Sequence, residues 1–284
     1  MNTLAHIPTE TRPIHRAALF VLLLAGGQLI FVFGSPYFNV FPTNDNLLFS
    51  AALVVAFGLL ALAFRQRPSL SHYAPPVYAL FVAAAANLGL VIGPLNRFLN
   101  ATEPFRQMAE DKIAQFLVVV PIIVVLSWLA WRDHGYIYLK RGQPRRWLPF
   151  GLVSLAFCAV VMVWMLLSSG MTTAELLAAA PWILIFVGAN AVMEELWFRG
   201  VFLRSYEAAI GWAGTMAVTA LAYGVSHMNA TYFESAIGIV FGLGVIGLGL
   251  VMAWAMRWAD SLWGSVLFHM GMDMLIILPI VASL

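Results

Sequence analysis

Charged residues are scarce in this sequence. Of its 284 residues only 10% are Asp, Glu, Lys or Arg, whereas about 25% is usual in soluble globular proteins. Hydrophobic residues make up 62% of the chain, and its mean hydropathy is +0.88. This composition excludes a soluble globular domain and indicates an integral membrane protein.

The sequence also has few cysteines and a small net charge. Both features limit the classes of function that the protein can have. The single cysteine, Cys158, lies in an apolar stretch and cannot form an internal disulfide. The formal net charge is only +2, and the basic residues form short clusters between apolar runs. A nucleic-acid partner is therefore not expected.

Long apolar runs are what the sequence has in abundance. A helix needs about 20 apolar residues to cross a bilayer. The runs are too long and alternate too little for the strands of a membrane barrel. We therefore predict an all-α, polytopic transmembrane bundle with eight or nine spans, near residues 17–34, 46–64, 74–93, 113–131, 147–168, 177–198, 210–228, 236–256 and 262–283.

The distribution of Lys and Arg predicts the orientation of these spans, because cytoplasmic loops are enriched in both residues. The pattern favours a cytoplasmic N-terminus, nine crossings and an outside C-terminus, in the plasma (inner) membrane if the protein is bacterial. Segment 94–112 departs from it, and there we expect an interfacial amphipathic helix. The basic residues that set the pattern are Arg12, Arg16, Arg65, Arg67, Lys140, Arg141, Arg145 and Arg146.

The basic, polar segment 132–146 is the strongest change in composition along the chain. It predicts an N-terminal group of helices, residues 1–146, that is accessory or shapes substrate access. Residues 147–284 then form a core that holds every intramembrane ionisable residue. In this core Gly238 and Gly242 form a small-xxx-small pair, which predicts close helix packing.

The run Glu-Glu-Leu-Trp-Phe-Arg at residues 194–199 places three ionisable side chains inside an apolar span. Such groups are costly in a bilayer and persist where they face one another or a wet cavity. Residues four apart share a helical face, so Glu195 and Arg199 are expected to form a structural salt bridge. Glu194 points about 100° away from Glu195, and we predict that it is a general base.

Two later apolar runs carry further polar pairs with the same spacing. Tyr223 and His227 share one helical face, and His269 and Asp273 share another. Imidazole is the side chain best suited to proton transfer near neutral pH. We therefore predict that Glu194 and His227 deprotonate a water. In this hypothesis His269 and Asp273 orient the water, stabilise an oxyanion or ligate a metal, and the reaction is hydrolysis of a peptide bond within the membrane.

Straight helices do not bring these groups together. With a rise of about 1.5 Å per residue, Glu194 and His227 would lie at different depths. We therefore expect the seventh helix to be tilted or broken, or to begin with an interfacial turn around residues 207–213.

The three motifs resemble those of a known family. Glu194-Glu195-x-x-x-Arg199, Tyr223-x-x-x-His227 and His269-x-x-x-Asp273 are similar to the motifs of the CAAX protease and bacteriocin-processing family of intramembrane proteases, related to the Ras-converting CAAX endopeptidase. The resemblance covers residues 147–284. It implies a membrane-protein or lipidated-peptide substrate, water activation by Glu194 and His227, and oxyanion stabilisation by His269 with Asp273.

Two positions depart from the usual motifs. Tyr223 stands where the second motif usually begins with Phe, so its hydroxyl needs a partner. Asp273 ends a motif that ends in Asn or Asp, and a carboxylate is a poor oxyanion donor. The family is described both as glutamic-type proteases, which need no metal, and as metalloproteases. In the second case zinc held by Glu194, His227, His269 and Asp273 is the expected cofactor.

Three alternative functions are left open by the motifs. A proton-coupled transporter would also carry intramembrane Glu and His, but it should show inverted repeats. A non-proteolytic membrane scaffold or immunity protein would retain the site and act by binding. A serine protease would have to use Ser226 with His269, although Ser226 lacks the Gly-x-Ser-x-Gly context.

Overall fold

The computed structural model describes residues 13–38, 40–93, 103–228 and 235–282. Throughout these ranges the regular elements are helices and there is no strand, as the apolar runs predict. The helices are α1 (Pro13–Gln28), η1 (Leu29–Phe33), α2 (Thr43–Gln66), η2 (Ser71–Tyr73), α3 (Ala74–Ile92), α4 (Pro104–Trp131), η4 (His134–Ile137), α5 (Pro144–Ser168), α6 (Thr173–Glu195), η5 (Leu196–Gly200), α7 (Leu203–His227), α8 (Ser235–Ala259), α9 (Trp263–Ile276) and α10 (Leu278–Val281).

Eight helical segments in the described residues are long and apolar enough to cross a bilayer, which confirms the polytopic all-α prediction. The ninth predicted span is different. Residues 262–283 contain α9, which has 14 residues, and the short α10. At about 1.5 Å per residue α9 is roughly 21 Å long, which is less than the ~30 Å of a hydrocarbon core. Ile277 interrupts the helix, and Pro279 follows within α10.

The segment predicted as an interfacial helix, 94–112, is only partly described. Residues 94–102 lie outside the described ranges. From Pro104 onward the chain is part of α4, which continues without a break to Trp131. Residues 104–112 are therefore the first turns of a long membrane helix and do not form a separate amphipathic helix.

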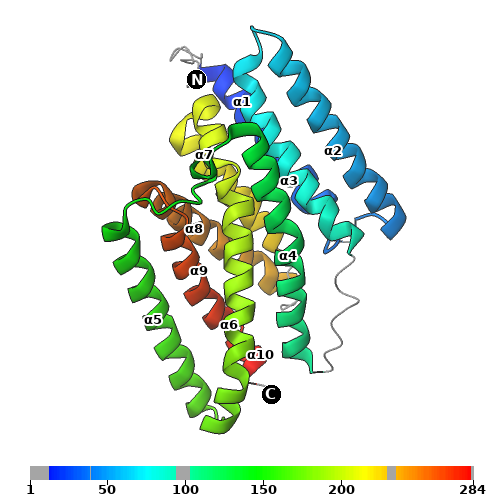
Figure 1. Cartoon of the computed structure of the whole chain (residues 1–284). Helices are drawn as coiled ribbons and strands as arrows, with labels where there is room; N and C mark the ends of the chain where they lie inside the picture. Colours follow the sequence, from blue (N-terminus) through cyan, green and yellow to red (C-terminus); the bar gives the residue numbers. More distant parts are fainter. Residues whose placement is uncertain (1–12, 39, 94–102, 229–234, 283–284) are drawn as a thin grey trace.

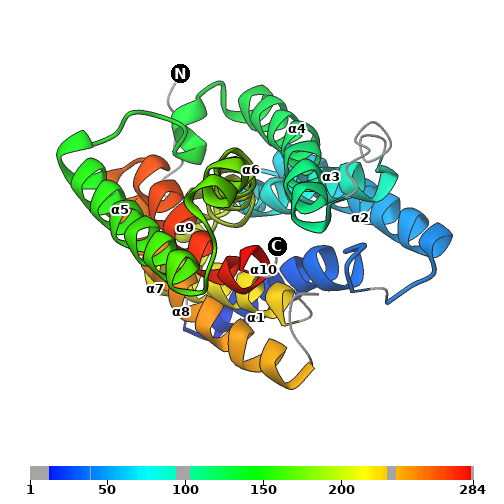
Figure 2. The ribbon, with the colours of Figure 1, turned by 90° about the horizontal axis from the view of Figure 1, so that it is seen from below.

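Helix α6 lies near the middle of the bundle. It packs against α4 on one side and α9 on the other, and α9 in turn packs against α5, an arrangement visible in Figure 2. The remaining large contacts pair α2 with α3, α7 with α8 and α1 with α7. Figure 1 shows α1 beginning and α10 ending at opposite ends of the molecule. The helix that carries both glutamates is thus enclosed by helices from both halves of the chain.

Glycines bring α7 and α8 close together. A Cβ atom added to Gly242 would lie 2.9 Å from the Gly224 carbonyl oxygen, and one added to Gly238 would lie 2.5 Å from the Met228 carbonyl oxygen. The predicted packing role of the Gly238 and Gly242 pair is therefore confirmed. Gly244 and Gly247 face open space and do not contribute to this contact.

Two irregular segments set the path of the chain between α6 and α7. The π-helix η5 follows Glu195 directly, and a buried Trp197 in it donates a hydrogen bond of 3.1 Å to the carbonyl of Ala83 on α3. Helix α7 is then kinked at Gly211, where φ is 74° and ψ is 170°, a conformation that is essentially restricted to glycine. This kink lies in the 207–213 window where a break was expected.

Candidate active site

Glu194 at the end of α6 and His227 at the end of α7 face each other. Oε2 of Glu194 lies 3.6 Å from Nε2 of His227. The glutamate side chain is 9% exposed and the imidazole 21% exposed. Oε2 makes no hydrogen bond within the described chain. The kinked α7 therefore brings the two predicted water-activating groups together without letting them bond directly.

The other nitrogen of His227 has a fixed partner. Nδ1 lies 2.8 Å from the carbonyl oxygen of Tyr223. A carbonyl can only accept, so Nδ1 carries the proton and, in the neutral ring, Nε2 presents its lone pair toward Glu194. Ser226 Oγ also donates to this carbonyl at 2.7 Å. Ser226 and His227 lie on the same helix, and this hydrogen bond directs the Ser226 hydroxyl to the Tyr223 carbonyl.

Glu195 and Arg199 form the predicted salt bridge. Arg199 Nη1 donates to Glu195 Oε1 at 2.6 Å, and both side chains are fully buried. The same carboxylate oxygen lies 2.9 Å from Nδ1 of His269 on α9. One buried carboxylate thus joins η5 to α9 and orients the second histidine of the site.

His269 and Asp273 lie on one face of α9, as their spacing predicts. Nε2 of His269 is 3.4 Å from Oδ1 of Asp273 and 3.7 Å from Oε2 of Glu194. Asp273 is held in turn by Asn190 on α6, whose Nδ2 donates to Oδ2 at 2.9 Å. Asn190 was not found from the sequence. Its position four residues before Glu194, on the same helical face, was a usable signal.

Tyr223 stands where the motif usually has Phe, and its buried hydroxyl has the hydrogen-bond partner that it needs. Its hydroxyl lies 3.2 Å from Nε2 of His269. The guanidinium of Arg199 stacks over its ring at 4.0 Å from the centroid, a favourable cation–π arrangement. Tyr223 is therefore in contact with Arg199 and both histidines.

A lysine from the N-terminal half also enters the site. Lys112 on α4 places Nζ 3.9 Å from Oε1 of Glu194, and its side chain is 17% exposed. The prediction that all intramembrane ionisable residues lie in residues 147–284 is therefore wrong. Lys112 ends segment 94–112, where an interfacial helix was expected, and the sequence alone does not show that α4 packs against α6.

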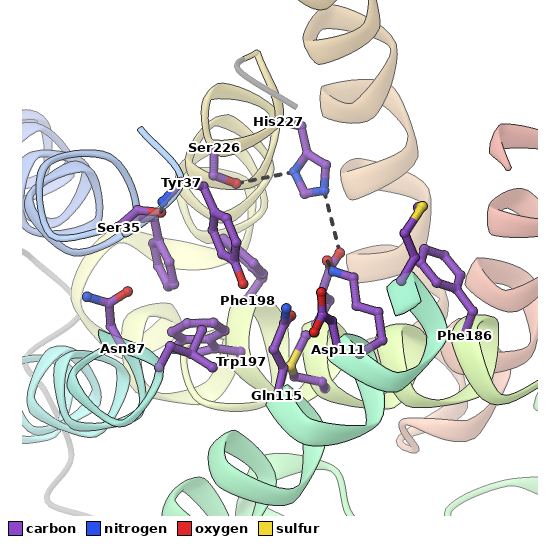
Figure 3. A pocket seen from close by; sticks show the side chains of 16 residues that line it. Ser35, Tyr37, Asn87, Asp111, Gln115, Phe186, Trp197, Phe198, Ser226 and His227 are labelled. Carbon is purple, nitrogen blue, oxygen red and sulfur yellow. Dashed lines mark hydrogen bonds and ion pairs between the residues drawn. The ribbon is translucent and has the colours of Figure 1, made fainter. Parts of the chain in front are cut away.

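A cavity of about 430 Å³ opens beside Glu194 and His227 (Figure 3). Its walls combine aromatic side chains with a few polar ones. Nine of its sixteen lining residues come from the N-terminal segment 1–146. The lining residues are Phe31, Ser35, Tyr37, Asn87, Leu90, Met108, Asp111, Lys112, Gln115, Phe186, Met193, Glu194, Trp197, Phe198, Ser226 and His227.

A second, narrow cavity of about 50 Å³ lies on the His269 side of the same residues. Asn190, Tyr223, His269 and Asp273 are among the residues that line it. Four residues line both cavities and form the waist between them: Lys112, Phe186, Glu194 and His227. The predicted site residues therefore meet at and beside the residues that a large cavity and a small one share.

Comparison with known protein families gives a match that includes these site residues. Residues 176–275 match the family model described as type II CAAX prenyl endopeptidase Rce1-like. The match covers 100 of the 284 residues and supports membership of the CAAX protease family for this segment. The matched segment contains every site residue predicted from the three motifs, whereas Lys112 lies outside it. Searches of curated proteins and of solved structures gave no match.

Membership of this family, together with eight apolar helices, indicates an integral membrane protease. Zinc is a cofactor that the resemblance allows. No group of three or more His, Cys, Asp and Glu side chains in the described residues has the geometry to hold a metal ion. His269 Nδ1 and Asp273 Oδ2 are already bonded to Glu195 and Asn190. Glu194, His227, His269 and Asp273 thus do not form a metal set in this arrangement.

Proposed function

We propose that this CAAX protease cleaves a peptide bond of a membrane-associated or lipidated substrate with a water activated by Glu194 and His227. The observation that carries the proposal is the 3.6 Å separation of Glu194 Oε2 and His227 Nε2 at the waist between the two cavities. Both atoms are acceptors when the glutamate is ionised and the imidazole neutral. A water between them donates one hydrogen to each and keeps its lone pairs for attack.

The chemistry follows from this arrangement. The water oxygen attacks the carbonyl carbon of the scissile bond, and one of its protons passes to the Glu194 and His227 pair. As the C–N bond breaks, the same pair returns that proton to the leaving amine. The products are a new carboxylate and a free amine. Because Tyr223 accepts from Nδ1 of His227, the basic nitrogen stays directed at the water.

The carbonyl oxygen gains negative charge in this step and needs a hydrogen-bond donor. We assign that role to the doubly protonated ring of His269, which donates from Nδ1 to Glu195 and from Nε2, beside Glu194, to the oxyanion. Asp273 is a carboxylate that already accepts from Asn190. It therefore orients and electrostatically supports His269, and it does not donate to the oxyanion itself.

The large cavity supports a substrate with an apolar part. Phe31, Trp197 and Phe198 provide aromatic wall beside His227, and its volume is that of a ligand site of ordinary size. We infer that residues 1–146 shape the approach of substrate, since they supply most of its lining. A lipidated peptide would place its apolar group against these rings and its peptide bond at the waist.

The proposal is tested with purified protein in lipid vesicles and a quenched fluorescent peptide that carries a prenylated CAAX end. Glu194→Gln should abolish cleavage, because the amide cannot accept the proton of water. The matched control is Glu175→Gln, at a glutamate that caps the opposite end of α6. A Gln still completes a capping box, so this variant should cleave at the wild-type rate.

If the wild-type protein leaves this probe intact, new protein termini in membranes that contain wild type or Glu194→Gln identify other substrates. Termini that appear only with wild type support the proposal. Equal termini with both proteins overturn it and favour a scaffold or immunity role. Proton flux into vesicles that is lost in Glu194→Gln would instead favour a transporter.

A further inference from the structure

Tyr223 contacts the two histidines of the site through different atoms. Its backbone carbonyl accepts from Nδ1 of His227 at 2.8 Å, and its side-chain hydroxyl lies 3.2 Å from Nε2 of His269. The residue is 3% exposed and is among those that line the narrow cavity. Its ring is held by the guanidinium of Arg199. Tyr223 is therefore fixed by packing independently of the two hydrogen bonds.

The surroundings of His269 explain why a hydroxyl matters at this place. Nδ1 faces the Glu195 carboxylate, and Nε2 faces Asp273 and Glu194. Ionised carboxylates only accept hydrogen bonds, so they cannot satisfy an unprotonated Nε2. Among these neighbours the Tyr223 hydroxyl is the group that both donates and accepts. It can donate to Nε2 when that nitrogen is unprotonated, and it can accept from Nε2 when the nitrogen carries a proton.

We propose that Tyr223 is a positioning residue that sets the orientation of both histidines, His227 through its carbonyl and His269 through its hydroxyl. The inference rests on the proposed function, in which these rings activate water and stabilise the oxyanion. It assigns to the hydroxyl a function that the Phe usual at this motif position cannot perform. The charged and titratable side chains that face His269 and its neighbours are Lys112, Glu194, Glu195, Arg199, His227 and Asp273.

Tyr223→Phe separates the two contacts because it deletes the hydroxyl and keeps the ring and the carbonyl. We expect kcat to fall about three- to tenfold, the effect of one ordinary hydrogen bond, with KM unchanged. The matched control is Tyr206→Phe. Tyr206 is a buried tyrosine of the same helix, packed on Phe202, and its variant should keep the wild-type kcat.

Nitrogen-15 NMR of labelled histidines gives a readout that does not depend on cleavage. In Tyr223→Phe the Nε2 resonance of His269 should move, whereas the Nδ1 resonance of His227 should keep its position because the carbonyl remains. Ser226→Ala removes the other group near Nδ1 of His227, at 3.2 Å. It should leave His227 with its proton on Nδ1.

The outcomes separate this inference from the proposed function. Loss of cleavage in Glu194→Gln, together with a wild-type kcat and unmoved His269 resonances in Tyr223→Phe, overturns the inference and leaves the proposed function intact. Cleavage that survives Glu194→Gln overturns the proposed function itself. A shift of His269 in Tyr206→Phe as large as in Tyr223→Phe also overturns the inference, because the effect would then be a general change in packing.

Discussion

Asn190 and Asp273 are 83 residues apart in the sequence, yet the amide nitrogen of Asn190 donates to Oδ2 of Asp273 at 2.9 Å. Both side chains are buried. This bond joins α6 to α9 on the side of the site where the oxyanion is expected to form. It also satisfies one oxygen of a carboxylate that would otherwise lie in a poorly solvated cavity.

Replacing Asn190 with Ala should therefore lower kcat/KM. A hydrogen bond to a charged group contributes about 1.5–3 kcal/mol, so we expect a loss of about ten- to a hundredfold if the bond is fully used in the transition state. Ser265→Ala is the comparison variant, since it removes another buried α9 hydrogen bond, to the carbonyl of Met252, that involves no charged group. Steady-state cleavage by both variants checks this. An Asn190→Ala enzyme with wild-type kcat/KM would show that Asp273 needs no such support.

The sequence predicted the pairs on single helices well, because they depend only on helical periodicity. Glu195 with Arg199 and His269 with Asp273 are four residues apart and lie together in the structure. The break near Gly211 could also be anticipated, because the depths of Glu194 and His227 did not match in straight helices.

Some features of the site could not be predicted from the sequence, because they depend on packing between helices that are far apart in the chain. Lys112 approaches Glu194 only because α4 packs along α6, and no local pattern reports that contact. The ninth apolar run was long enough in composition, but the interruption at Ile277 leaves α9 with 14 residues. Composition measures the length of an apolar run and does not measure the continuity of the helix within it.

Lys112 provides a second prediction, because its ammonium faces Oε1 of Glu194 and leaves Oε2 toward His227. Lys112→Met should reduce kcat about tenfold, which corresponds to ~1.4 kcal/mol of lost transition-state stabilisation. Lys112→Arg should retain part of the activity because it keeps a cation. Lys140→Met is the control, as Lys140 pairs with Asp260 outside the site. Equal kcat in Lys112→Met and wild type would mean that this lysine has no part in the reaction.

The buried Glu195 and Arg199 pair should be more important for stability than any exposed ion pair. Removing one partner of a buried pair leaves an uncompensated charge and costs about 3–5 kcal/mol. We expect Arg199→Met to unfold at a markedly lower temperature in detergent. The double variant Glu195→Met with Arg199→Met should recover much of that stability but remain inactive, because His269 then lacks its Nδ1 partner. Equal destabilisation of the single and double variants would contradict this account.

Gly211 is the position where backbone conformation controls the site most directly. Its φ of 74° with ψ of 170° is strained for any residue with a Cβ, at a cost of about 1–3 kcal/mol. Gly211→Ala should lower the thermal stability and also the cleavage rate, since a straighter α7 would move His227 away from Glu194. Gly247→Ala on α8 faces open space and should change neither property. If Gly211→Ala is as stable and active as wild type, the kink does not set the geometry of the site.

Figure 1 shows the end of α4 and the start of α7 at the end of the bundle where α1 begins. Lys140, after α4, and Arg204, in the first turn of α7, both pair with Asp260, and Arg257 near the end of α8 pairs with Glu207. This group of basic residues predicts that this end is cytoplasmic. A cysteine-free background is available through Cys158→Ala, because the chain has one cysteine. In it, Ser169→Cys between α5 and α6 should react with a membrane-impermeant maleimide added to intact cells. Gln143→Cys, in the exposed turn before α5, should react only after permeabilisation. The opposite labelling pattern would reverse the predicted orientation.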